Sequence, residues 1–372
     1  MEKMKQMRPE TEAELAELVA GLSGPVRIAG GGTRGVTGRE PELKVSGLSG
    51  ITLYEPGALT LVAKAGTPLA EIEAALDGEG QQLAFEPMDH RGLLEIRGNP
   101  TIGGVVAANI SGPRRIQAGA CRDYLLGVRF VDGRGQVIRN GGRVMKNVTG
   151  YDLVKLMGGS WGTLGVVTEV SLKVLPKPER SSTLSVAVSD IGVAVRVLSA
   201  ALKSPFEVTG AAYDPNLQKA LIRVEGFEDS VAYRTSRLTS ELEGFGDVAE
   251  ESKSEALWAG IRDVHPFQGK EGDVWRLSVK PGDAAEISAR AEADQALFDW
   301  GGGLVWLRVP AGTDVRARLG AFSGHATLVR SDHATFGKLG RFHPESTSIS
   351  ALTKGLRAKF DPRGLFNPGL MG

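Results

Sequence analysis

The residues best suited to chemistry form a glycine-rich run near the N-terminus. Gly30-Gly31-Gly32-Thr33-Arg34-Gly35 follows Val26–Ala29, an apolar stretch typical of a short strand. The run satisfies the G-x-G-x-x-G spacing of dinucleotide-binding turns, but such a turn leads directly into a helix, and no apolar periodicity follows before Pro41. We therefore predict an irregular loop whose exposed N–H groups bind an anion, with a hydroxyl from Thr33 and a charge from Arg34. A plain surface turn is the alternative, although consecutive glycines cost chain entropy.

A second run is dominated by small residues. It reads Thr101-Ile102-Gly103-Gly104-Val105-Val106-Ala107-Ala108-Asn109-Ile110-Ser111-Gly112, in sequence that would otherwise pack as a helix. Small side chains allow a flat ligand to lie against the backbone. Glycine supplies 50 of the 372 residues, which is nearly twice its usual share. Because apolar β-branched residues surround the clusters, the excess indicates close approach of the backbone rather than a flexible linker.

Composition excludes several classes of protein. The chain has 44 basic and 44 acidic residues, which argues against a dominant nucleic-acid or anionic-membrane surface. Its single cysteine, Cys121, rules out an internal disulfide, a self-contained iron–sulfur cluster and a cysteine-rich zinc site. No window reaches the roughly 18 apolar residues of a membrane span, and the charged N-terminus is unlike a secretory signal. We expect an intracellular protein without its own membrane anchor.

The elements that must position these runs fall into two halves. In the first, the pattern predicts a helix over 9–22, strands over 43–45, 51–54 and 60–64, a hairpin around Asp132-Gly133-Arg134-Gly135, and a long strand over 164–174. Pro176-Lys177-Pro178 then marks a domain boundary, giving domains 1–178 and 179–372. In the second half we predict strands over 183–188, 221–224, 274–279 and 304–309, and helices over 193–202, 231–242 and 284–298. This order indicates an α+β unit with an antiparallel sheet and helices on one face, and no internal repeat is visible.

Four motifs in a fixed order carry a family resemblance across roughly residues 8–178. They are the glycine loop, T-x-G-G-x-x-A-x-N-x-x-G from Thr101, R-D-x-x-L-G from Arg122, and G-x-L-G-V-x-T from Gly162. In this order the chain resembles the FAD-binding domain of the vanillyl-alcohol-oxidase type of flavoproteins. Further motifs are similar to the FAD-binding E subunit of bacterial glycolate oxidase, over nearly the whole chain: Gly112-Pro113-Arg114-Arg115, Met145 to Leu153, Phe298-Asp299-Trp300-Gly301-Gly302, Gly324-His325-Ala326-Thr327 and Phe366-Asn367-Pro368-Gly369.

The resemblance implies a fold and a set of cofactor-binding residues. The fold would be α+β, with a vanillyl-alcohol-oxidase-type FAD-binding domain and a ferredoxin-like cap domain whose C-terminal segment returns toward the flavin. The glycine loop would hold the pyrophosphate. Because that loop lacks the histidine of relatives that tether the flavin, we expect non-covalent FAD. The implied FAD-binding residues are Gly30, Gly31, Gly32, Thr33, Arg34, Gly35, Thr101, Gly103, Gly104, Ala107, Asn109, Ser111, Gly112, Gly119, Arg122, Asp123, Gly165, Val166, Val167 and Asn367.

The residues for catalysis are less complete. Oxidation of a 2-hydroxy acid by flavin needs a base, a cation for the carboxylate and a substrate carbon near the flavin. Catalytic relatives of the companion D subunit carry a spaced histidine pair and a later Glu-His, whereas here His325 is followed by His333 out of that spacing. The catalytic candidate is therefore His325 alone, and no metal is predicted. For Lys146 and Asn147 two interpretations stay open, neutralising reduced flavin or positioning their loop.

The resemblance also implies partners. The chain would be an oxidoreductase subunit, not active alone, of a complex whose catalytic D subunit oxidises glycolate, a small 2-hydroxy acid, to glyoxylate and whose iron–sulfur F subunit passes electrons on. It would support flavin binding, assembly or electron transfer, and be cytoplasmic, reaching the inner membrane only through partners. One alternative is an autonomous FAD-dependent 2-hydroxy-acid dehydrogenase. Another is a scaffold with a degenerate flavin site, against which the intact glycine runs count.

Overall fold

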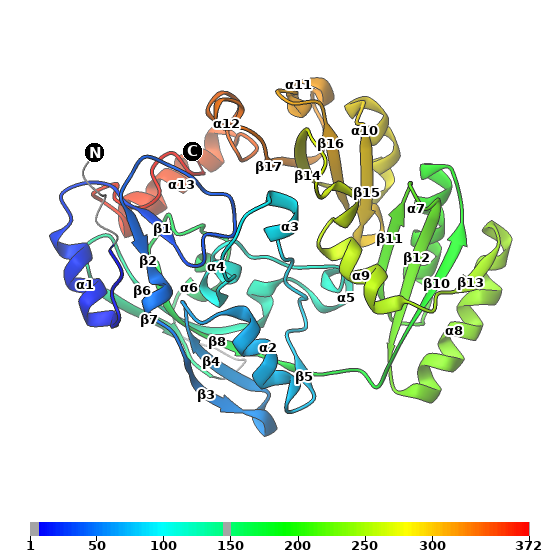
Figure 1. The fold of residues 1–372 in the computed structure, drawn as a ribbon, viewed down its shortest axis with the longest axis horizontal. Helices are drawn as coiled ribbons and strands as arrows, with labels where there is room; N and C mark the ends of the chain where they lie inside the picture. Colours follow the sequence, from blue (N-terminus) through cyan, green and yellow to red (C-terminus); the bar gives the residue numbers. More distant parts are fainter. Residues whose placement is uncertain (1–6, 144–149, 372) are drawn as a thin grey trace.

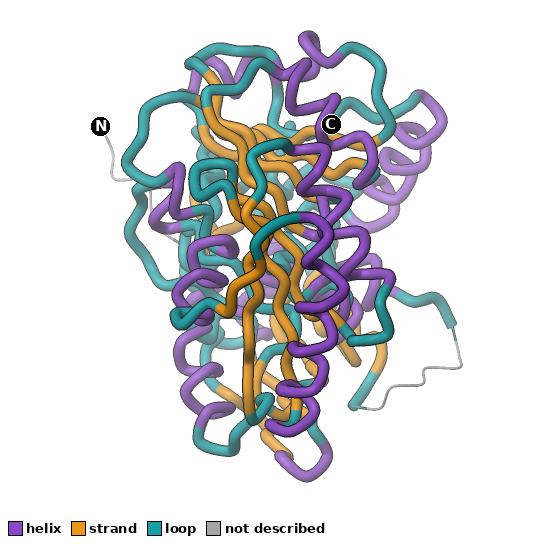
Figure 2. Tube along the Cα trace, turned by 90° about the vertical axis from the view of Figure 1, so that its right-hand side faces the viewer, coloured by secondary structure: helices purple, strands orange, loops and turns teal. Residues whose placement is uncertain are grey.

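Two separate β-sheets, one in each half of the chain, organise the molecule (Figure 1). The computed structural model describes residues 7–143 and 150–371. The N-terminal domain surrounds a five-stranded sheet, and the cap domain is built on an eight-stranded sheet. A view turned by 90° shows the strands running through the middle of the molecule with helices on both sides (Figure 2). None of the helices in the described ranges has the length and apolar character needed to span a bilayer.

The five-stranded sheet is antiparallel throughout, in the order β3-β4-β8-β6-β7. Its faces follow the two-residue period of a strand: Val166 packs with α1, whereas Val167 packs with α2 and α4 on the opposite side. The predicted hairpin around Asp132 joins β6 to β7 and is confirmed. The bounds are α1 (Glu12–Gly21), α2 (Leu69–Asp77), α4 (Ile102–Ala107), β3 (Ile51–Glu55), β4 (Thr60–Lys64), β6 (Leu125–Val131), β7 (Val137–Gly141) and β8 (Val166–Lys173).

A parallel two-stranded sheet carries the glycine loop and receives the C-terminus. It pairs β1 with β2, and Phe366 forms a bridge beside Val26 at the start of β1. The last residues of the chain therefore belong spatially to the N-terminal domain. The bounds here and in the connections are β1 (Arg27–Ala29), β2 (Glu42–Lys44), β5 (Gln81–Gln82), β9 (Leu175–Pro176), α3 (Arg91–Leu94), α5 (Arg115–Ala118) and α6 (Leu153–Met157).

The cap sheet consists of two β-α-β-β-α-β units placed edge to edge. Its order is β13-β10-β12-β11-β15-β16-β14-β17, all antiparallel, and β11 pairs with β15 where the units meet. The first unit is β10 (Arg180–Ala187), α7 (Ile191–Lys203), β11 (Val208–Asp214), β12 (Lys219–Gly226), α8 (Glu228–Leu242) and β13 (Val248–Glu250). The second is β14 (Asp273–Val279), α10 (Ala284–Ala291), β15 (Gln295–Asp299), β16 (Leu304–Val309), α11 (Val315–Leu319) and β17 (Gly324–Arg330).

The two faces of the cap sheet have different partners. Helices α7, α8, α10 and α11 bury one face, as the predicted one-sided arrangement requires. The other face packs on α9 (Ser254–Arg262) and on Met88 and Leu93 of the N-terminal domain. Beyond β17, the chain forms α12 (His333–Leu339) and α13 (Thr347–Phe360) before it returns to β1. The second face is therefore the one that can contribute to a site between the domains.

Two features of the cap differ from the sequence prediction. The predicted helix over 284–298 is wrong in its second half, because Glu292 adopts a left-handed φ of 48° and ends α10, and Gln295–Asp299 then form β15. The duplicated topology was also not visible in the sequence. The two units share their order of strands and helices but not their residues. Different apolar side chains can form the same arrangement, so the repeat leaves no repeated sequence.

Candidate functional site

A cavity lies where the glycine loop, α4, β8 and the C-terminal segment meet. We call it the first cavity. Twelve of the sequence-predicted cofactor residues line it: Gly30, Gly31, Gly32, Thr33, Arg34, Thr101, Gly103, Gly104, Ala107, Gly165, Val167 and Asn367. They come from segments more than 300 residues apart in the chain, so the fold brings together what the motifs separate.

The glycine loop offers free donors to this cavity. None of the six backbone N–H groups from Gly30 to Gly35 donates a hydrogen bond to another residue that the structure describes. Gly32 and Gly35 adopt φ values of +69° and +64°, which turn the loop in a way that L side chains rarely allow. A run of unpaired N–H groups in a concave loop is suited to a phosphate or another anion.

Packing inside the protein explains several of the glycines. A Cβ on Gly30 would overlap the Thr101 hydroxyl, and one on Gly31 would overlap the Asn99 carbonyl oxygen. A Cβ on Gly103 would lie 2.6 Å from that of Ala65, and one on Gly165 would lie 2.8 Å from the Phe130 ring. The expected close approach of the backbone is thus present, but at these positions it is the protein's own atoms that come close.

The C-terminal segment closes the first cavity through Asn367. Its amide oxygen accepts a hydrogen bond from the Ile28 N–H (2.8 Å), and its amide nitrogen donates to the Trp161 carbonyl oxygen (2.8 Å). Asn367 and Trp161 both adopt left-handed φ values, 43° and 51°. Asn367 therefore locks strand β1, the Trp161 turn and the chain terminus into one wall, and the polar groups of its side-chain amide are used within the protein.

Arg34 is the charged residue of the glycine loop, and its positive charge is poorly compensated by its neighbours. Its Nε and Nη2 are shielded from solvent without a hydrogen-bond partner in the described structure. Nη1 lies 2.6 Å from His90 Nδ1 and 3.3 Å from the Met88 carbonyl oxygen. Burial lowers the pKa of Arg34 to about 10. Since a guanidinium only donates, Nδ1 of His90 accepts, and burial and the Arg34 charge hold the pKa of His90 well below its ordinary value.

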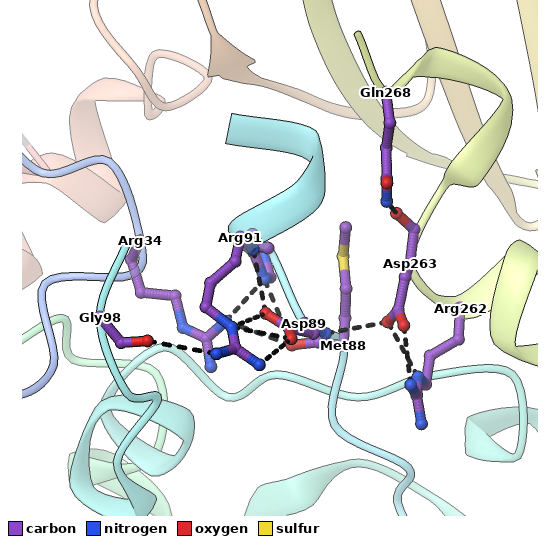
Figure 3. A network of polar contacts seen from close by, with 9 residues as sticks. Arg34, Met88, Asp89, Arg91, Gly98, Arg262, Asp263 and Gln268 are labelled. Carbon is purple, nitrogen blue, oxygen red and sulfur yellow. Dashed lines mark hydrogen bonds and ion pairs between the residues drawn. The ribbon is translucent and has the colours of Figure 1, made fainter. Parts of the chain in front are cut away.

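A polar network fixes the segment that carries His90 against the cap (Figure 3). The Asp89 N–H donates to Asp263 Oδ1 (2.9 Å), and Arg91 forms an ion pair with the Asp89 carboxylate (2.7 Å). Arg262 binds both carboxylate oxygens of Asp263, at 2.8 and 2.7 Å, which fixes that acceptor at the end of α9. The position of the Arg34–His90 pair is therefore set by contacts of the same segment with the cap.

A second cavity lies between the N-terminal domain and the open face of the cap sheet. It shares the lining residues Arg34, Ala108 and Trp161 with the first cavity, so the two cavities adjoin at these residues. Four predicted cofactor residues line only this cavity: Asn109, Ser111, Gly112 and Arg122. A ligand extended along the first cavity would present its end to the second.

The second cavity is strongly cationic. Its lining contains one carboxylate, that of Asp299, and six arginines. The arginines are Arg34, Arg115, Arg122, Arg262, Arg276 and Arg341. Burial raises the pKa of Asp299 to about 7, and its Oδ1 accepts the Trp300 N–H at 2.7 Å. Burial, followed by the nearby Arg115 charge, lowers the pKa of Arg276 to about 10. Such a lining favours an organic anion.

His325, the catalytic candidate, lies at the start of β17 and lines the second cavity. Burial and the charges of Arg276, His343 and Arg115 lower its pKa, which favours the neutral imidazole. Its neighbour His343 accepts the Ala326 N–H through Nδ1 (3.4 Å). Across the residues that the structure describes, no group of three His, Cys, Asp or Glu side chains is arranged to hold a metal ion.

Four predicted cofactor residues line neither cavity. The carbonyl oxygen of Gly35 accepts a hydrogen bond from Arg341, and Val166 packs against α1. Asp123 accepts the Ala120 N–H (2.8 Å) and lies beside Gly119, which adopts a φ of +90°. These residues shape loops around the cavities. Lys146 and Asn147 fall outside the described residues.

Sequence reasoning missed most of the residues that the cap contributes. Arg276, Asp299 and Trp306 come from three strands, and only Asp299 belongs to one of the sequence motifs, without an assigned role. Trp161, which joins the two cavities, resembles a packing residue in the sequence. The signal that could have found it is its place between glycines, Gly159 and Gly162, in a turn of positive φ.

Comparisons with known proteins place this geometry in context. Residues 6–141 match the model of a family described as FAD binding domain. The chain is 38% identical over 352 residues to "Glycolate oxidase subunit GlcE" of Escherichia coli (strain K12), covering 93% of this chain and 92% of that protein. It is 44% identical over 141 residues to "Glycolate oxidase subunit GlcD" of Bacillus subtilis (strain 168), covering 38% of this chain and 28% of that protein.

Among solved structures, the chain is similar to alkyldihydroxyacetonephosphate synthase, with a TM-score of 0.70 and 16% identity, over 97% of this chain and 76% of that one. This likeness extends over nearly the whole chain and confirms the predicted α+β FAD-binding fold of the vanillyl-alcohol-oxidase type. The free N–H groups of the glycine loop and the uncompensated Arg34 fit the phosphates of such a cofactor.

Proposed function

The chain belongs to the GlcE family of glycolate oxidase components, and from that membership we propose that it is the FAD-binding subunit of a complex that oxidises glycolate to glyoxylate. FAD, when bound, supplies the acceptor for the two electrons that leave the hydroxy acid. The proposal includes a catalytic D subunit and an iron–sulfur F subunit as partners. Any cluster would sit on another chain, since Cys121 is the only cysteine here. The complex would be cytoplasmic, with contact to the inner membrane made by partners.

The observation that carries the proposal is the first cavity. Twelve motif residues line it, and the backbone N–H groups of Gly30 to Arg34 in its loop donate to no other residue within the described ranges. In the proposal these groups bind the pyrophosphate, while Arg34 adds a positive charge that no described carboxylate pairs with by hydrogen bond or ion pair. The small residues of α4, Gly103, Gly104 and Ala107, leave room for the rest of the cofactor. The protein thus binds and orients the cofactor, and Asn367 forms part of the wall beside it.

The two residues most capable of tethering a flavin support non-covalent binding instead. His90 uses Nδ1 to accept from Arg34, and its lowered pKa leaves it neutral. Cys121 is fully buried, and burial raises the pKa of its thiol, so the nucleophilic thiolate is disfavoured. We therefore propose that the cofactor is held by contacts alone.

One observation favours a second candidate, an autonomous FAD-dependent 2-hydroxy-acid dehydrogenase. The cationic second cavity adjoins the first at Arg34, Ala108 and Trp161, which is where a substrate would need to meet the end of a bound cofactor. In that case the chain would itself reduce its flavin with glycolate. If the chain is instead a dependent subunit, glycolate reduces its flavin only when the partner subunits are present.

The visible spectrum of the purified chain tests both candidates. We expect a yellow protein with flavin absorbance whose cofactor is released by denaturation and identified as FAD. A folded chain without flavin, even after incubation with FAD, would refute the proposal and favour an empty scaffold. Anaerobic addition of glycolate then separates the candidates. Persistent absorbance that bleaches only when the D subunit is added supports the dependent component, whereas bleaching of the isolated chain supports the autonomous enzyme.

A further inference from the structure

We propose that Arg115 and Arg276 form a binding site for the carboxylate of a small organic acid. Both arginines line the second cavity, and both pack against the Trp300 ring. The site belongs to this chain, and it deepens the role of a cofactor-binding subunit by giving it a ligand pocket of its own. The inference rests on the proposed function only for the kind of acid, a 2-hydroxy acid or its 2-oxo product.

Trp300 is held across the boundary between the domains. It follows β15 of the cap, and its indole Nε1 donates to the Gly112 carbonyl oxygen of the N-terminal domain (3.0 Å). Trp300, Gly301 and Gly302 adopt consecutive positive φ values of 53°, 67° and 98°. A non-glycine residue in this conformation costs about 1 kcal/mol or more, so the surroundings must impose it. Strain of this kind is consistent with a turn built to place one ring.

Two guanidiniums from different domains pack on this ring. The Arg115 Cζ, from α5, lies 4.7 Å from the centre of the Trp300 ring, and the Arg276 Cζ, from β14, lies 5.1 Å from it. Arg276 also lies 6.0 Å from the Trp306 ring. Stacking fixes the plane of a guanidinium while its N–H groups remain available at the edge. The two arginines are therefore oriented before any ligand arrives.

Neither side chain has a polar partner. Within residues 7–143 and 150–371, the side chains of Arg115 and Arg276 form no hydrogen bond and no ion pair. They contrast with Arg262, which lines the same cavity but is held by both oxygens of Asp263. Two like charges that pack on one ring repel each other, and an anion bound beside them would offset that repulsion.

The other polar residues of the second cavity indicate the size and chemical class of the anion. Asp299 lies in the same cavity, so a bulky polyanion would meet its carboxyl, whereas a small acid can be held at the arginines. Thr327, the register partner of Arg276 on β17, and His325 add polar groups suited to a hydroxyl or carbonyl oxygen beside the carboxylate. A planar carboxylate matches the fork of a guanidinium, and this geometry favours it over a compact inorganic anion.

Calorimetric titration of the full chain with oxalate tests the site. Oxalate is a small acid that offers carboxylates but no hydroxyl to oxidise, so binding is measured apart from turnover. We expect saturable binding to the unaltered chain and a loss of affinity of about tenfold or more in Arg115→Gln and in Arg276→Gln, since each removes a charge-assisted hydrogen bond. Arg276→Lys keeps the positive charge but not the two-pronged guanidinium. Its affinity for oxalate should lie between that of the unaltered chain and that of Arg276→Gln.

The matched control is Arg237→Gln, which removes the same charge from the exposed face of α8 and should leave the affinity unchanged. Flavin content, measured on every variant, separates this test from that of the proposed function, because oxalate binding does not require a yellow protein. If Arg276→Gln does not fold, Arg115→Gln, on the short helix α5 that has no fully buried residue, carries the test. Unchanged oxalate affinity in the folded arginine variants, or no binding to the unaltered chain at millimolar oxalate, would overturn the proposal.

Discussion

Asp299→Asn should make the stability of the protein less sensitive to pH. The folded-state pKa of this carboxyl is raised by burial from 3.8 to about 7, so the folded protein holds the proton more tightly than the unfolded chain does. Its contribution to stability is therefore fully present below pH 3.8 and is lost as the pH rises toward 7. The difference of about 3 pKa units corresponds to about 4 kcal/mol above pH 7. Asparagine carries no charge, and its amide oxygen can still accept the Trp300 N–H.

Urea unfolding at pH 5 and pH 8 measures this effect. At pH 5 the unaltered chain has lost somewhat more than a third of the total, so about 2 to 3 kcal/mol remains to be lost by pH 8. We expect Asp299→Asn to gain that amount relative to the unaltered chain between the two conditions. Asp247→Asn, which changes an exposed carboxyl, is the control and should show no such gain. If the difference between Asp299→Asn and the unaltered chain is the same at both pH values, the proposed effect of burial on Asp299 is refuted.

Three other substitutions probe the first cavity and the domain boundary. Gly31→Ala should abolish flavin retention, because its Cβ would overlap a backbone oxygen, while Gly57→Ala, where nothing lies within 4 Å, should retain it; absorbance per chain gives the result. Arg34→Gln should weaken FAD binding at least tenfold in a fluorescence titration while leaving the unfolding midpoint of the flavin-free chain unchanged or higher, since it removes an uncompensated buried charge. Glu86→Gln should cost about 2 kcal/mol in urea unfolding, because the buried Arg223 guanidinium loses its two-point carboxylate partner and keeps its ion pair with Glu225.

Much of the first cavity could be predicted from the sequence because its lining comes largely from a few motifs whose own residues are neighbours in the chain. Each motif is a local run, such as Gly30 to Gly35, in which residue type and backbone requirement coincide. Order along the chain was then sufficient to identify the fold, since the relative positions of such runs are kept while loops change. The physical reason for a given glycine was less accessible. At Gly31 and Gly103 the constraint comes from Asn99 and Ala65, which no local pattern reveals.

The second cavity could not be predicted in the same way. Arg276, Asp299 and His325 are brought together by the order of β15, β16, β14 and β17, in which β14 precedes its neighbours in sequence but lies between β16 and β17. A single arginine in a strand of alternating burial resembles an ordinary edge residue until that order is known. The error at α10 has the same origin, because the apolar residues of Gln295–Asp299 continue a helical pattern that the sheet overrides.

Buried ion pairs cross the boundary between the domains at this site, beside the apolar cluster that contains Met88 and Leu93. Glu86 of the N-terminal domain binds Arg223 of β12 with two bonds of 2.9 Å, and Arg114 lies 3.2 Å from Glu225. A buried ion pair adds little net stability compared with apolar packing, but it tolerates only one geometry. That property is what a shared pocket requires, because Arg115 and Arg276 reach Trp300 from opposite domains. A sliding apolar interface would change the spacing of the two guanidiniums, whereas the Glu86–Arg223 pair fixes it before any ligand binds.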